Sequence, residues 1–202
     1  MTGSWEIKVN TSGMPQKVAT AFGKLNDMVG AEYNFLAYLG SQLVNGTNHA
    51  VLAEQTVVTG KDTKNVVVVI FNEKPNDMEA TLVNIERVVE SGGSLGGINV
   101  DVKTDIPDDA MDALNAVMNG FVGSSIKPIA LLGTQVTKGT NYIFAATVAP
   151  VTPNPENHVA LVIANSMTGE LSFVDLLTTK HEVMSLGYAF TWLKSQNTSL
   201  GK

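Results

Sequence analysis

Apolar and polar side chains alternate at the start of this chain. The alternation runs from Trp5 to Asn10 and is the period-2 pattern of a half-buried β-strand. Ser12–Pro15 then interrupts the pattern, and Pro15 suits the first turn of a helix, where a missing N–H costs little. Apolar residues recur from Val18 to Val29 at spacings of three and four, which predicts an amphipathic helix.

Extended segments follow this predicted helix. Three strands are expected, at 33–44, 49–59 and 65–71, and the last contains the β-branched run Val66–Ile70. The segment Lys74–Asp77 ends this series of three antiparallel strands. Apolar residues at positions 78, 82, 85 and 89 then have helical spacing, so we expect a second amphipathic helix from about residue 77 to 91.

The second half of the chain repeats this order. A strand around Ile98–Val102 precedes Pro107 and an apolar helical stripe that reaches Phe121. The further elements expected are strands at 129–138, 141–151, 158–164 and 170–177, and a closing helix at about 181–193.

One ten-residue stretch occurs twice with small changes. Leu39–Asn48 reads LGSQLVNGTN, and 93 residues later Leu132–Asn141 reads LGTQVTKGTN. Because the correspondence extends from the first strand to the last helix, we interpret the chain as a tandem duplication. The Gly- and Ser-rich stretch Ser91–Gly97 is the expected linker, which gives a first unit at 1–95 and a second at 96–202.

Both copies end in a predicted reversal of the chain. Asn45-Gly46 and Lys138-Gly139 place a glycine between two β-favouring runs, which is typical of a hairpin turn. Each copy is therefore predicted to form a hairpin tip.

These tips resemble the inhibitory hairpin of the cystatin and stefin family of cysteine-protease inhibitors, whose pattern is Gln-x-Val-x-Gly. Gln42, Val44 and Gly46 match it fully, whereas the second copy has Gln135 and Gly139 but a threonine between them. The resemblance implies an α+β fold. We thus expect two tandem cystatin-like units, each a helix on a curved antiparallel sheet, with an extra C-terminal helix per unit.

The resemblance also implies a non-enzymatic function. In that family an N-terminal glycine, the Gln-x-Val-x-Gly tip and a second hairpin form a wedge that blocks the cleft of a papain-like protease, and the inhibitor needs no catalytic residue. The corresponding partner-binding candidates here are Gln42, Val44, Asn45, Gly46, Pro75, Gln135, Lys138 and Gly139.

A structural interpretation of the same residues stays open. A glycine in a turn often serves a positive φ, and a neighbouring Gln or Asn often hydrogen-bonds to the turn. The protein would then be a structural or assembly protein that does not inhibit proteases, or a small-ligand binder with a cavity between helix and sheet. An enzyme is the least favoured class, since no nucleophile–base pair can be assembled from the sequence.

Composition limits the classes of partner and cofactor that we expect. The 202 residues are 44% hydrophobic and 16% charged, as in a globular protein, and the net charge of −6 argues against a nucleic-acid partner. With no cysteine and only three scattered histidines, we expect no metal and no cofactor. No apolar run is long enough to span a membrane and no signal peptide is evident. We therefore expect a soluble protein, cytoplasmic by default or secreted if a leader has been removed, with a protein partner or a second copy of itself.

Overall fold

The computed structural model describes residues 3–58, 63–92 and 97–177. The chain divides into two compact units, the first with residues up to Val88 and the second with Val89–Leu176. Each is described by itself. The predicted boundary between residues 95 and 96 falls outside the described residues and stays a prediction.

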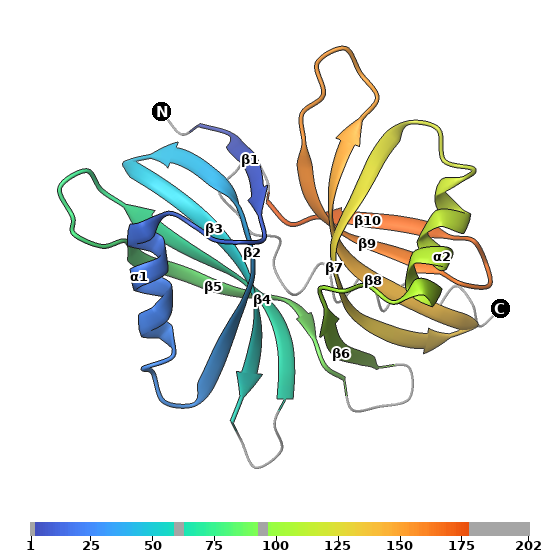
Figure 1. The fold of residues 1–202 in the computed structure, drawn as a ribbon, viewed down its shortest axis with the longest axis horizontal. Helices are drawn as coiled ribbons and strands as arrows, with labels where there is room; N and C mark the ends of the chain where they lie inside the picture. The colour runs from blue at the N-terminus through green and yellow to red at the C-terminus, as the bar shows by residue number, and fades with distance from the viewer. Residues whose placement is uncertain (1–2, 59–62, 93–96, 178–202) are drawn as a thin grey trace. The chain divides into compact units, whose positions relative to one another are not determined.

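The first unit is built on an antiparallel sheet with the strand order β1-β2-β3-β4-β5 (Figure 1). Helix α1 (Gln16–Leu25) lies between the first two strands in the chain. The strands are β1 (Trp5–Asn10), β2 (Ala31–Val44), β3 (Gly46–Val57), β4 (Thr63–Glu73) and β5 (Thr81–Glu90).

The second unit has the same order of elements. Helix α2 (Asp108–Met118) again lies between the first two strands in the chain, and the sheet has the order β10-β9-β8-β7-β6. Its strands are β6 (Ile98–Lys103), β7 (Ser124–Thr137), β8 (Gly139–Pro150), β9 (His158–Asn165) and β10 (Leu171–Asp175).

Each helix packs its apolar face on its own sheet, as the spacing of its apolar residues predicts. Val18 and Phe22 of α1 are buried against a cluster that includes Val69 and Phe71 of β4. In the second unit, Leu114 of α2 is buried in the cluster of β8 and β9 side chains. The core of each unit thus consists of the apolar face of its helix packed on its own sheet.

Strand pairing agrees between the units at positions 93 residues apart. Trp5 pairs with Gln42 in the first sheet, and Ile98 pairs with Gln135 in the second. The irregularities in β2 and β7 match as well, at 38–40 and at 131–133. The repeat seen in the hairpin sequences therefore extends to the register of the strands, while its origin by duplication stays an interpretation.

The α+β prediction of cystatin-like units with an extra C-terminal helix is wrong. The described part of the chain is mostly β, with ten strands and two helices of 10 and 11 residues. The helix expected at about 77–91 is instead strand β5. Its sequence TLVNIERVVE is rich in β-branched residues, and β5 pairs with the otherwise open edge of β4. The closing helix expected at 181–193 lies outside the described residues.

Candidate functional site at the hairpin tips

Both predicted hairpins are present, and each reverses at its glycine. Asn45 connects β2 to β3, and Leu43 pairs with Thr47 across the turn. Gly46 has a φ of 97° and Gly139 a φ of 90°, a backbone region that other residues rarely adopt. The turn geometry therefore requires a glycine in both tips.

The two glycines are also closely packed. A Cβ atom on Gly46 would lie 2.6 Å from the carbonyl oxygen of Glu73, at the end of β4. One on Gly139 would lie 2.7 Å from the Cβ of Met167, in the β9–β10 turn. Real Cβ contacts are not so short, so neither position has room for a side chain.

A row of side-chain amides anchors the first tip across three strands. The Asn72 amide donates to Asn48 Oδ1 at 2.8 Å, and Asn48 Nδ2 lies 3.5 Å from Gln42 Oε1. Gln42, with only 1% of its surface exposed, donates from Nε2 to the carbonyl of Gly3 at 3.0 Å. The glutamine of the motif thus holds the tip in place from inside the protein.

The second tip has the same row of amides. Asn165 Nδ2 donates to Asn141 Oδ1 at 2.7 Å, and Asn141 Nδ2 donates to Gln135 Oε1 at 3.0 Å. Asn165 Oδ1 also accepts the backbone N–H groups of Met167 and Thr168, which closes the β9–β10 turn. These hydrogen bonds connect each tip to the two neighbouring strands, and amides of this kind are costly to leave unpaired.

The residue after each buried glutamine is apolar and exposed. Leu43 has 70% of its surface exposed and Val136 has 74%. Beside them, Asn45 and Lys138 are exposed and Val44 is half-buried. Any partner that meets these tips therefore contacts the apolar side chain and the turn residue, not the glutamine.

Three segments meet at the first tip. The N–H of Gly3 donates to the carbonyl of Leu43 at 2.9 Å, which places the N-terminal segment beside the hairpin. On the other side, Gly46 abuts Glu73, the last residue of β4. The exposed Pro75 follows in the loop between β4 and β5. The candidates of the first unit are thus brought to one end of its sheet, and Gln135, Lys138 and Gly139 form the second tip.

A polar cluster behind the first tip was not identified from the sequence. The Tyr38 hydroxyl lies 2.9 Å from His49 Nδ1, and His49 Nε2 lies 3.5 Å from a carboxylate oxygen of Glu73. Glu73 in turn pairs with Lys17 of α1 at 3.2 Å. This cluster connects β2, β3, β4 and α1 at the end of the sheet that carries the tip.

Burial sets the protonation of this cluster. Burial lowers the pKa of His49 below its ordinary value, although the nearby Glu73 carboxylate opposes the shift. Burial also raises the pKa of Tyr38; a hydrogen bond from Ser41 opposes this shift, and the charges of Glu6 and Glu73 add to it. At neutral pH the imidazole is therefore neutral and the phenol keeps its proton.

The hairpin turn could have revealed this cluster. Counting outward from Asn45 pairs His49 with Ser41, and Tyr38 lies on the same strand as Ser41. The histidine is therefore a buried residue of strand β3. The sequence also offered a sign of the two rows of amides, because Gln42 and Asn48 recur 93 residues later as Gln135 and Asn141.

The described part of the chain contains no group of three or more His, Asp or Glu side chains arranged to hold a metal ion. No helix described there is both long and apolar enough to cross a membrane.

Comparison with known proteins gives no match: no family model, no curated protein and no solved structure is significantly similar to this chain. The resemblance to cystatins therefore rests on the Gln-x-Val-x-Gly residues alone.

Proposed function

We propose that this protein is a non-enzymatic binding protein that engages a protein partner through its hairpin tips. The observation that carries the proposal is the exposure of Leu43 and Val136 at corresponding positions of two braced turns. A leucine buried in a complex contributes about 1.5–3 kcal/mol relative to an exposed one. Because the tip is already rigid, little ordering entropy opposes binding.

The partner class that we propose is a papain-like cysteine protease. The support is the motif Gln42, Val44 and Gly46, together with the gathering of Gly3, the tip and the Pro75 loop at one end of the first sheet. A narrow turn flanked by two further segments suits insertion into an open cleft. In this proposal the protein blocks the cleft without taking part in any chemical step.

The first tip is the stronger inhibitor in this proposal. It has the full motif and the larger apolar side chain, Leu43, where the second tip has Val136 and the charged Lys138. Charge at the centre of an interface is costly to desolvate. We therefore expect the first unit to account for most of the inhibition.

Papain activity titrated with the full-length protein tests this function. Leu43→Asp should weaken inhibition at least tenfold, which corresponds to about 1.4 kcal/mol. Val136→Asp should weaken it less. The matched control is Val29→Asp, since Val29 is also an exposed apolar residue but lies in the loop at the other end of β2.

Substitution of Gly46 is a poor probe of binding. Gly46→Trp would abolish inhibition, but the new side chain also collides with Glu73 and disturbs the fold. Leu43 has no such conflict because its side chain already faces solvent. If wild-type protein leaves papain fully active at tens of micromolar, the range of weak encounters, the protease proposal fails.

A role in assembly is the second candidate. It is favoured by apolar side chains exposed at the other end of each sheet, where Val29 and Val58 correspond to Val122 and Val151. Exposed apolar groups at matching positions suit contact with further protein copies. Sedimentation of the full-length protein over a concentration range tests this: a monomer at all concentrations, unchanged by Val29→Asp, contradicts self-assembly.

A further inference from the structure

The first unit contains a pocket of about 350 Å³ between β1, β2 and the segment that leads into α1. This volume is at the lower end of the range for small-molecule sites. The residues buried under α1 come from β2, β3, β4 and the loop after β4, so the helix leaves the β1 side of the sheet uncovered. The pocket occupies that uncovered side.

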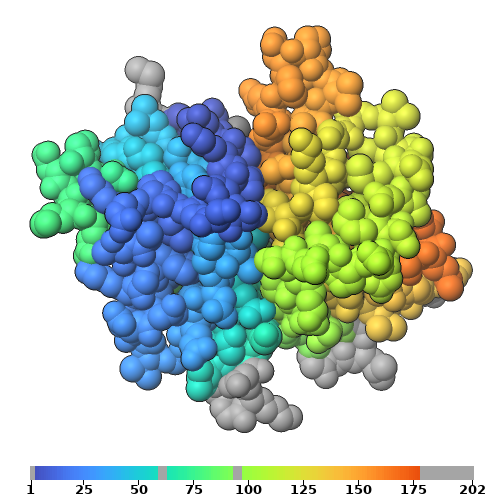
Figure 2. Space-filling view, in the orientation of Figure 1, coloured from blue at the N-terminus to red at the C-terminus, as the bar shows by residue number. Residues whose placement is uncertain are grey.

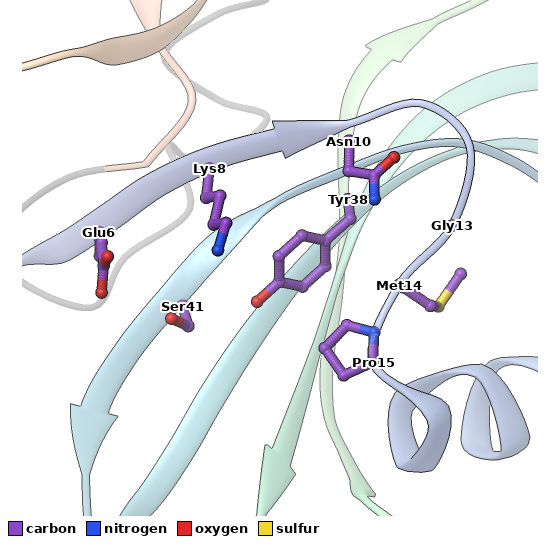
Figure 3. Close-up of a pocket in the computed structure, with 8 residues that line it drawn as sticks. All are labelled: Glu6, Lys8, Asn10, Gly13, Met14, Pro15, Tyr38 and Ser41. Carbon is purple, nitrogen blue, oxygen red and sulfur yellow. The ribbon is translucent and has the colours of Figure 1, made fainter.

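One wall of the pocket carries two opposite charges. Glu6 and Lys8 alternate with half-buried residues on β1, so both point to the same face of the strand (Figure 3). Among the described residues, neither makes an ion pair within 4.0 Å. On β6 of the second unit, by contrast, Asp101 and Lys103 form an ion pair, with 3.2 Å between Lys103 Nζ and Asp101 Oδ1.

The centre of the pocket offers hydroxyl groups. Glu73 lies beside His49 Nε2 and favours a proton there, so the Tyr38 hydroxyl donates to His49 Nδ1. The Ser41 side chain hydrogen-bonds to the Tyr38 oxygen, so the two hydroxyls form one polar group in the wall of the pocket. Figure 3 shows this hydroxyl and the Lys8 amino group directed toward the region of Ser41, which also lines the pocket.

The opposite end is more apolar. Met14 and Pro15 line it, with the Asn10 amide nearby on β1, and the Tyr38 ring lies between them and the charged wall (Figure 3). A bound molecule would therefore meet a cation, a carboxylate and hydroxyls at one end and hydrocarbon at the other.

We propose that this pocket binds a small zwitterion, namely a free α-amino acid with an aliphatic side chain. Its carboxylate meets Lys8, its ammonium meets Glu6, and its side chain packs on Met14 and Pro15. A ligand with a single charge would satisfy one member of the Glu6–Lys8 pair and face the other as a like charge. The second unit lacks the site, because Leu131 replaces Tyr38 and the charges of β6 pair with each other.

Titration of the isotope-labelled full-length protein with L-leucine, followed by amide NMR spectra, tests this proposal. We expect saturable shifts at Lys8, Tyr38 and Ser41. The matched probes are isopentylamine, which lacks the carboxylate, and 4-methylpentanoate, which lacks the ammonium. Each should bind about fivefold more weakly, which is the loss expected for one exposed ion pair.

Charge variants test whether leucine is recognised through Glu6 and Lys8 or binds non-specifically. Glu6→Gln and Lys8→Gln should each weaken leucine binding about fivefold, whereas Lys103→Gln in the second unit should leave it unchanged. The double exchange Glu6→Lys with Lys8→Glu should restore binding, since both charges are again present. The dispersion of the same spectra reports whether each variant is folded.

Three results overturn the proposal. They are the absence of saturable shifts up to about 10 mM leucine, a range that still detects millimolar affinity; equal binding of leucine and both single-charge analogues; and shifts confined to residues away from the pocket. None of them bears on the hairpin tips, which the papain titration tests separately.

Discussion

Gly40 and Gly133 face the backbone of β1 and β6, at positions that have no room for a side chain. A Cβ atom on Gly40 would collide with the backbone carbonyl of Glu6, and one on Gly133 would collide with that of Asn99. Backbone cannot move aside as a flexible side chain does. The two glycines are thus required for pairing of the first strand of each sheet.

We predict that Gly40→Ala destabilises the first unit by about 1–3 kcal/mol, the usual cost of overpacking. Amide exchange in β1 and β2 of the full-length protein, measured by mass spectrometry, gives the local free energy of opening. The control is Gly23→Ala in α1, where nothing lies within 4 Å of the new methyl group. Gly23→Ala should stabilise the helix by about 0.5–1 kcal/mol. If both substitutions change the free energy of opening in the same direction, the explanation is contradicted.

The amide rows lead to a second prediction at this scale. Asn141→Ala removes one hydrogen bond from each of Gln135 and Asn165 and should cost about 1–3 kcal/mol. Asn115→Ala is the control, because Asn115 is an exposed residue of α2 and alanine favours helix. Urea unfolding compares the two. Equal stability of both variants would show that the row contributes nothing.

At the residue scale, the sequence predicts the turn glycines but not what surrounds them. Asn45-Gly46 predicts a turn from local backbone chemistry alone. The neighbour that crowds Gly46 is Glu73, which is distant in sequence and belongs to a third strand. Contacts of this kind depend on the order and register of a third strand, so the approach of Glu73 to His49 was also revealed only by the structure.

Among the elements, β5 shows how hydrophobic spacing can mislead. Positions 78, 82, 85 and 89 have helical spacing, yet residues 81–90 form a strand. The β-branched residues and the open edge of β4 outweigh the spacing. The hairpins and first helices were predictable because turn residues, proline and periodicity all agree there. In the segment of β5 these signals conflict.

The exposure of Met78 and Ile85 distinguishes the two alternatives for this segment. In a helix these residues would share one face, and truncating either would cost a similar amount. In the structure Met78 is 96% exposed, whereas Ile85 packs against the core cluster under α1. We predict that Ile85→Ala costs about 1–2 kcal/mol, part of the loss for a fully buried residue.

Met78→Ala should change stability by less than about 0.5 kcal/mol, as is usual for surface substitutions. Thermal unfolding of the two variants provides the comparison. Backbone carbon chemical shifts of residues 81–90 provide an independent check, because strand and helix shift them in opposite directions. Equal losses of stability together with helical shifts would contradict the strand.

For the whole molecule, the two units share a framework but differ in their polar chemistry. The positions of Tyr38, His49 and Glu73 correspond to Leu131, Tyr142 and Ser166 in the second unit. Tyr142 there donates to Asp109 Oδ2 at 2.9 Å, a contact at the start of α2. The framework residues are therefore repeated, while the buried histidine and the pocket belong to the first unit.

This difference predicts that mild acid weakens one unit more than the other. In the described residues His49 is the buried histidine, and burial lowers its pKa in the folded state. The unfolded chain binds the proton more readily, so stability is lost as the pH falls below about 6.5, the ordinary histidine value. The loss continues until the pH passes the lowered pKa of the folded state. Groups that face His49 are Tyr38, Glu73 and, through Glu73, Lys17.

Amide exchange of the full-length protein at about pH 7 and about pH 5.5, on either side of the ordinary histidine pKa, measures this effect after correction for intrinsic rates. We expect protection in β2, β3 and β4 to fall more than protection in β7, β8 and β9. His49→Gln should reduce the difference between the units, because glutamine does not titrate but can still accept a hydrogen bond from Tyr38. If the variant keeps the full pH dependence of the wild type, another group is responsible, and the buried imidazole is not what makes the first unit sensitive to acid.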